Sequence, residues 1–136
     1  MIEVGEYVRT ETGFIRRIKS VDKTEATENC PVNMYWCNLD KPIKILKECS
    51  KDTIYAIEMS DAKKLKHSKN IIDLIEVGDY VNGEKIEQIT TDSGYKKYYT
   101  TGFGVYDEYD NESVIHSILT KEQYEANCYK VKEEIC

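Results

Sequence analysis

The sequence predicts a mainly β protein made of two tandem small β modules. Isoleucine and tyrosine occur 15 and 11 times against two prolines in 136 residues, and both favour the pleated, half-buried surface of a sheet. Short apolar segments alternate with turn signals along the chain. A seven-residue stretch also occurs twice, 73 residues apart. A chain of 136 residues can hold one or two small domains, and the repeat favours two.

The repeated stretch begins each module. IEVGEYV at Ile2–Val8 recurs as IEVGDYV at Ile75–Val81. Two weaker matches pair Gly13–Ile15 and Ile18 with Gly83–Ile86 and Ile89, and residues 70–75 with residues 113–118. The repeat therefore predicts a first module over 1–74 and a second module over 75–136.

The heptad predicts an opening strand followed by a hairpin. Residues of a strand alternate between its two faces, which places Gly78 and Tyr80 opposite Val77, Asp79 and Val81. The glycine would allow a close backbone approach or a bulge. Asn82–Gly83 predicts a tight reversal because both residues tolerate positive φ, and Thr12–Gly13 predicts a longer one.

Further strands are expected where β-favouring segments lie between turn signals, namely at 32–39, 43–49, 53–59, 96–101 and 105–109. Helix is expected in only two places. Thr120 and Gln123 have the spacing of a capping box, which predicts a short C-terminal helix through about Ala126. Residues 68–71 predict a single turn between the modules.

The heptad, in its I-x-V-G-D-Y-V form, resembles the opening strand of SH3-like small β-barrels, including KOW-type modules. This resemblance implies two tandem SH3-like barrels, the second carrying the short helix. The stretches 70–83 and 120–124 also resemble small proteins of clostridial phages and prophages. That second resemblance implies a mobile-element setting and brings no catalytic residues.

Charge is divided unequally between the modules. Residues 1–73 carry a net charge of +1 and residues 74–136 a net charge of −7. The acidic module should repel nucleic acid, but its surface could dock on a basic protein. The candidate protein-binding residues form one stretch: Tyr106, Asp107, Glu108, Tyr109, Asp110 and Glu112. A solvated loop that contributes only to solubility is the alternative interpretation.

The first module offers a second candidate site, because KOW-type barrels often contact nucleic acid. Its candidate phosphate-binding residues are Arg16, Arg17, Lys19, Lys63, Lys64 and Lys66. The alternative is that these charges lie on edge strands and discourage pairing with strands of other molecules. A nucleotide-signal sponge, with a pocket between modules of paired subunits, is a further hypothesis.

The sequence contains no motif for catalysis, metal binding or cofactor binding. G-x-S-x-G, the phosphate-binding loop and H-E-x-x-H are all missing. Five cysteines form no CxxC pair, so we expect reduced thiols, no zinc site and no cofactor. The sequence lacks an apolar run of about 18 residues and a signal-like start, which favours a bacterial cytoplasm and no membrane partner.

These observations together predict a non-enzymatic binding protein. The phage resemblance implies an accessory or anti-defence inhibitor that binds a host protein with a basic surface through the acidic second module. Nucleic-acid binding by the first module remains the alternative. A role as a structural virion or assembly component is a further possibility.

Overall fold

The computed structural model describes residues 2–41 and 53–128. The chain divides into two compact units, 1–74 and 75–136, and the division falls where the sequence repeat begins again. Both units are mainly β, so the predicted fold class is confirmed at that level. The strand expected at 43–49 lies outside the described residues.

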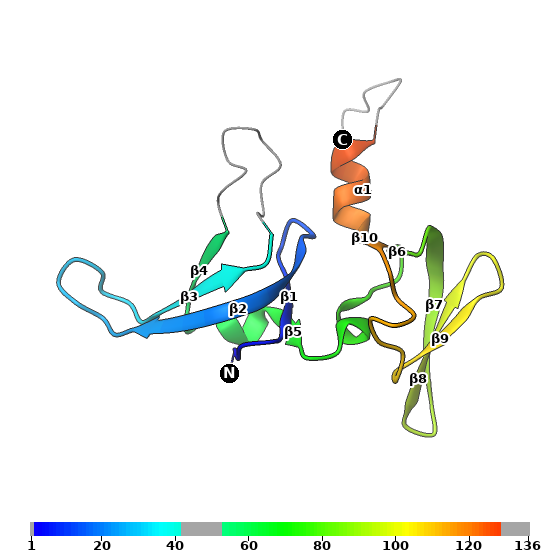
Figure 1. Ribbon diagram of the computed structural model, residues 1–136, viewed down its shortest axis with the longest axis horizontal. Coiled ribbons are helices and arrows are strands. Elements are labelled where there is room, and N and C mark those ends of the chain that lie inside the picture. The colour runs from blue at the N-terminus through cyan, green and yellow to red at the C-terminus, as the bar shows by residue number, and fades with distance from the viewer. Residues whose placement is uncertain (1, 42–52, 129–136) are drawn as a thin grey trace. The chain divides into compact units, whose positions relative to one another are not determined.

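The first unit contains a five-stranded antiparallel sheet (Figure 1). Its strands are β1 (Tyr7–Arg9), β2 (Ile15–Thr24), β3 (Met34–Leu39), β4 (Ile54–Glu58) and β5 (Lys66–Ser68). They lie in the order β4-β3-β2-β1-β5. Two short 3-10 helices, η2 (Ala62–Lys64) and η3 (Ile71–Leu74), flank β5 along the chain.

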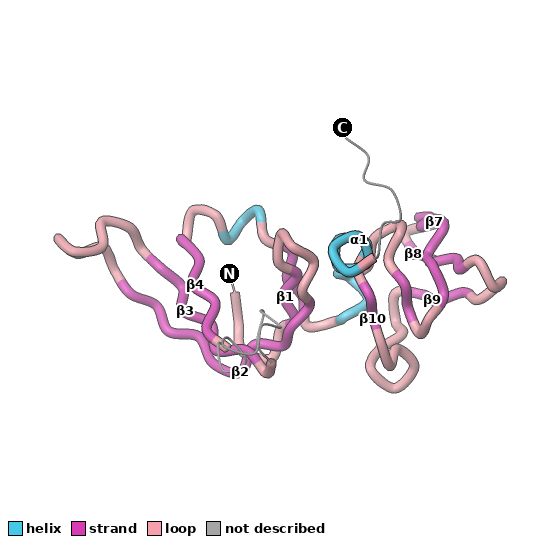
Figure 2. The backbone as a smooth tube through the Cα atoms, turned by 90° about the horizontal axis from the view of Figure 1, so that it is seen from above, coloured by secondary structure: helices cyan, strands magenta, loops and turns pink. Residues whose placement is uncertain are grey.

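The second unit repeats this arrangement. Its strands are β6 (Tyr80–Val81), β7 (Glu84–Asp92), β8 (Tyr95–Thr100), β9 (Val105–Asp107) and β10 (Ile118–Leu119), in the order β10-β6-β7-β8-β9. Figure 2 shows β7, β8 and β9 side by side. Helix α1 (Lys121–Asn127) follows β10, and the Thr120 hydroxyl accepts a hydrogen bond from the amide of Gln123 at its start. In both sheets the first strand therefore lies between the fifth and the second.

The heptad forms the same tight turn in both units. Gly5 and Gly78 adopt φ of +88° and +98°, a region that disfavours side chains. Their amides donate to the carbonyls of Ile18 and Ile86, each at 2.9 Å. The amides of these isoleucines donate back to the carbonyls of Glu6 and Asp79 at 2.8 and 2.7 Å. Because Ile18 and Ile86 make equivalent bonds, the predicted pairing of Ile18 with Ile89 is wrong.

A buried carboxylate stabilises each turn. Glu6 Oε1 accepts from the amide of Glu3 at 2.6 Å, and Asp79 Oδ2 accepts from the amide of Glu76 at 2.8 Å. The second carboxylate oxygen reaches the closing segment of the same unit. Glu6 Oε2 lies 2.9 Å from His67 Nδ1 in β5, and Asp79 Oδ1 accepts from the amide of Lys121 at 2.9 Å. Each carboxylate therefore joins the beginning of its unit to its end.

The turn corrects two expectations about the heptad. Val77 is 47% exposed, whereas Asp79 and Val81 are fully buried, because the strand begins only at Tyr80 and its alternation does not extend back through the turn. A Cβ at Gly5 would meet no atom within 4 Å, and one at Gly78 only Lys121 atoms at 3.5 Å. Of the two expectations for the glycine, the bulge is confirmed, because Gly78 and Asp79 both bond to Ile86 and Gly78 has positive φ, whereas a close backbone approach is not found.

The third sequence match is also corrected. The structure places η3 directly after β5 and α1 directly after β10, and β5 and β10 both pair with the first strand of their unit. The segments 71–74 and 121–127 therefore occupy equivalent places. Residues 113–118 precede that place, so they do not correspond to 70–75.

The core of the first unit lies between its sheet and η2. Its buried members are Ile2, Val8, Ile18, Tyr35, Cys37, Leu39 and Ala62. In the second unit the buried residues include Val81, Ile86 and Tyr98 together with the polar Asp79, Thr100 and Thr120. Burial raises the pKa of the Cys37 thiol, because a thiolate would lose its hydration there.

We expect Asp79→Ala to lower the free energy of unfolding by about 2–3 kcal/mol, because two backbone amides lose a charged acceptor. Asp79→Asn should cost less, since its remaining oxygen satisfies one amide. Urea unfolding measures both changes. Equal stability of Asp79→Ala and the wild type would contradict the proposed role of the carboxylate.

Stability should also fall with rising pH above about 8.5, the ordinary range of a thiol. The folded state holds the Cys37 proton more tightly than the unfolded state, so unfolding releases a proton in this window and becomes more favourable as pH rises. Urea unfolding of the reduced protein between pH 7 and 10 measures the slope. Cys37→Ala should have a flatter profile, and an unchanged slope in this variant would assign the effect to other groups.

Candidate protein-binding surface

The predicted acidic stretch forms a loop that closes the end of β9. The amide of Asp107 donates to Asp110 Oδ2 at 2.8 Å, and the amide of Asp110 donates to the carbonyl of Asp107 at 3.1 Å. The amide of Tyr109 donates to Asp107 Oδ1 at 2.8 Å. Two of the four predicted carboxylates therefore shape their own loop. The bond from the amide of Asp110 to the carbonyl of Asp107 closes a turn, so the chain leaves β8 after Asp107 and β9 ends there and not at residue 109.

The other predicted residues differ in how far they are exposed. Glu112 is exposed and Glu108 is half-buried. The Tyr106 hydroxyl accepts from Asn82 Nδ2 at 3.0 Å, so this side chain is turned toward the hairpin after β6. Tyr109 is 71% exposed, and its ring lies 6.1 Å from that of Tyr95.

One face of β8 and β9 extends this aromatic pair. Cross-strand partners in an antiparallel sheet share a face, and Tyr99 pairs with Val105 while Lys97 pairs with Asp107. Tyr95 lies on the same face as Lys97 and Tyr99 because faces alternate along a strand. The face combines exposed aromatic and aliphatic groups with charges of both signs.

Phe103, at the tip between β8 and β9, is the most exposed large apolar side chain in the described residues. It is 97% exposed and has φ of +66°. Such a conformation costs a residue with a side chain about 1–2 kcal/mol, and an exposed ring recovers nothing from burial. The sequence motif Gly102-Phe103-Gly104 is the signal that could have found this site.

A local network holds Phe103 in this conformation. Thr100 Oγ1 donates to Glu84 Oε2 at 2.8 Å and accepts from the amide of Gly104 at 2.8 Å. A Cβ at Gly104 would come 2.8 Å from Thr100 Oγ1, and a Cβ at Gly102 would collide with the Glu84 carboxylate. A side chain at either glycine would therefore displace Glu84 or Thr100 from this network, and the ring between them is presented on a pre-organised loop.

A hollow of about 300 Å³ lies elsewhere on the second unit, lined by Tyr80, Gly83, Ser117, Ile118, Leu119 and Tyr124. The Tyr80 and Tyr124 rings stack with centroids 5.1 Å apart. The nearby Tyr80 hydroxyl, followed by the Cys128 thiol, raises the pKa of Tyr124. Sequence patterns did not indicate this hollow, because its walls come from β6, β10 and α1.

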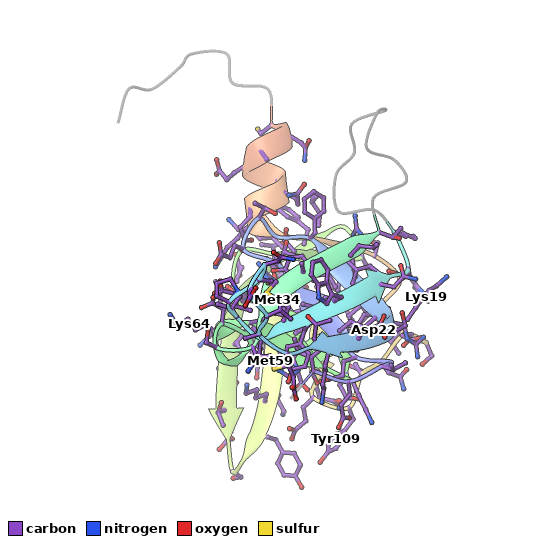
Figure 3. All side chains as sticks on the ribbon, turned by 90° about the vertical axis from the view of Figure 1, so that its left-hand side faces the viewer. Lys19, Asp22, Met34, Met59, Lys64 and Tyr109 are labelled. Carbon is purple, nitrogen blue, oxygen red and sulfur yellow. The ribbon has the colours of Figure 1, made fainter. Side chains whose placement is uncertain are left out.

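The predicted nucleic-acid residues lie on three elements of the first unit, β2, η2 and β5. Figure 3 shows Lys19 and Lys64 on opposite sides of the first unit. The Arg16 guanidinium lies 5.1 Å from the Phe14 ring centroid, and Arg17 lies 5.6 Å from that of Tyr7. Burial lowers the pKa of Arg16, an effect that Asp40 partly offsets. Lys63 lies in η2 and Lys66 in β5.

Among the described residues, no three His, Cys, Asp or Glu side chains converge as a metal site would require. Cys30, Cys37 and Cys128 are free thiols, and Cys49 and Cys136 lie outside the described residues. No helix in 2–41 or 53–128 is long and apolar enough to cross a membrane.

A scan against protein-family models finds no matching family, and searches of curated proteins and of solved structures find no match.

We expect Phe103→Gly to raise the free energy of unfolding by about 0.5–1 kcal/mol. The substitution removes the conformational cost of positive φ in the folded state. Part of this stabilisation is offset because glycine increases the conformational entropy of the unfolded chain. Phe103→Ala keeps the unfavourable φ and should give no such gain. Urea unfolding of the two variants compares them, and a loss of stability in Phe103→Gly would show that the ring supports the fold.

Proposed function

We propose that this chain is a non-enzymatic binding protein, built from two SH3-like units, whose acidic second unit docks on a partner protein. Phe103 is the observation that carries the proposal. The ring contributes almost no burial to the fold, and its backbone conformation costs stability. A large apolar side chain retained at such a position is best explained by a pocket that it fills on another molecule.

Two further features support the second unit as the docking unit. Eight of the 11 exposed large apolar side chains in the described residues belong to it. It also carries a net charge of −7 over residues 74–136. A partner with an apolar pocket bordered by basic residues would complement both features, because opposite potentials speed encounter and the anchor ring supplies affinity.

The resemblance to phage and prophage proteins favours a host protein as the partner and an accessory or anti-defence role. The repeated strand order, with the first strand between the fifth and the second, supports the SH3-like assignment.

Capture from a bacterial host lysate, followed by binding measurements on the purified captured protein, tests this proposal. Phe103→Ala should weaken binding at least about 30-fold, as expected for a central anchor worth 2 kcal/mol or more. Changing Asp107 and Asp110 to Asn and Glu108 and Glu112 to Gln removes four charges while keeping acceptors in the loop. This variant should slow association and flatten its salt dependence.

The matched control removes four charges from the first unit by changing Glu11, Asp22, Glu25 and Glu28 to their amides, all of them exposed. It should bind like the wild type. Equal binding by the wild type, Phe103→Ala and the acidic-loop variant would contradict the proposal. Salt-dependent binding to duplex DNA, lost with Arg16 and Arg17, would favour the nucleic-acid alternative instead.

A further inference from the structure

Strand β4 ends the strand order of the first sheet (Figure 1), and its outer edge has no strand partner among residues 2–41 and 53–128. The amide of Leu39 donates to the carbonyl of Thr53, and the amide of Met59 donates to the carbonyl of Asn33. Backbone bonds between two antiparallel strands recur at every second residue. Tyr55 and Ile57 therefore bond to β3, and the backbone groups of Ile54, Ala56 and Glu58 point away from the sheet.

These outward groups are largely without partners. The carbonyl of Glu58 accepts from the amide of Asp61 at 2.9 Å. Within the described residues, the outward amides and carbonyls of Ile54 and Ala56 make no hydrogen bond. The equivalent edge in the second unit differs, because Asp110 occupies both backbone groups of Asp107 there. An unpaired edge of this kind is a template for another strand.

The side chains along β4 suit a second copy of the same strand. A two-fold axis through Ala56 would place Ala56 opposite Ala56 of the other copy and Glu58 opposite Ile54 of the other copy. Alanine has the smallest side chain of the three residues whose backbone groups point outward. Like charges would not face each other, and the first unit has a net charge of only +1. Ile54 is 58% exposed, and Trp36, 39% exposed, is the cross-strand neighbour of Ala56. Pairing would cover Ile54, whereas the Trp36 indole is directed toward β2 by its hydrogen bond to Thr24 Oγ1 at 2.9 Å.

We propose that two copies of this chain associate by antiparallel pairing of their β4 strands about Ala56. About four new backbone hydrogen bonds would form across the axis, and the two sheets would become one. The contact uses the first unit and is independent of the partner proposed for the second.

Sedimentation at increasing protein concentration, together with hydrogen exchange of the β4 amides, tests this pairing. The outward amides of Ile54 and Ala56 should exchange more slowly as dimer forms, because the second copy of β4 would accept their hydrogen bonds. Ala56→Pro removes an outward amide that β3 does not use, which an edge strand tolerates. It should raise the dimer dissociation constant at least tenfold. Val105→Pro, the same change at an outward position of β9, should leave association unchanged.

A second pair of variants keeps the β4 backbone intact. Ala56→Glu and Ala56→Lys should each be monomeric, because like charges would meet at the axis, and a mixture of the two should form a heterodimer. A wild type that stays monomeric at millimolar concentration would overturn the proposal. Dimerisation of Ala56→Pro with the dissociation constant of the wild type would also overturn it. So would hydrogen exchange in which the β4 amides become protected only when a different protein is added.

Discussion

A buried carboxylate in the first turn of each unit is the interaction on which the rest of the fold depends. Glu6 and Asp79 each accept a backbone amide within their own turn and contact the segment that closes the same unit. Removing a charge from water is unfavourable unless its oxygens are satisfied, so the turn and the closing segment must come together. The first strand of each sheet follows this turn and pairs with both the second and the fifth strand.

The shared frame supports two different surfaces. In the first unit the closing segment continues into η3, and the edge strand β4 is five residues long and has no outer strand partner in the described part of the chain. In the second unit it continues into α1, and the edge strand β9 has three residues and is closed by its own acidic loop. Differences at edges and loops leave the core unchanged, which is why they can carry different binding roles.

The sequence predicted the features that depend on local pattern. The repeated heptad indicated where the second unit begins, and the spacing of Thr120 and Gln123 indicated α1 within one residue. Long-range hydrogen bonding decided what the pattern could not. Alternation failed at Val77 because residues 76–79 form a turn, in which the Asp79 amide donates to the carbonyl of Glu76, and the strand begins only at Tyr80. The acidic loop was predicted to be a free binding surface, because composition does not show that Asp110 bonds to Asp107 within the loop. The exposed, positive-φ presentation of Phe103 was not predicted, because the Glu84 carboxylate that packs against its flanking glycines lies on another strand.

Amide hydrogen exchange of the intact chain tests most directly whether the two turns organise their units. The decisive amides are those of Glu3 and Glu76, which donate to the two carboxylates, and those of Ile18 and Ile86, which donate to the turn carbonyls. If the account is right, all four exchange as slowly as the strand centres and do so through opening of the whole unit. Rapid exchange at Glu3 and Glu76, with the strands still protected, would mean that the sheets hold together without the carboxylates.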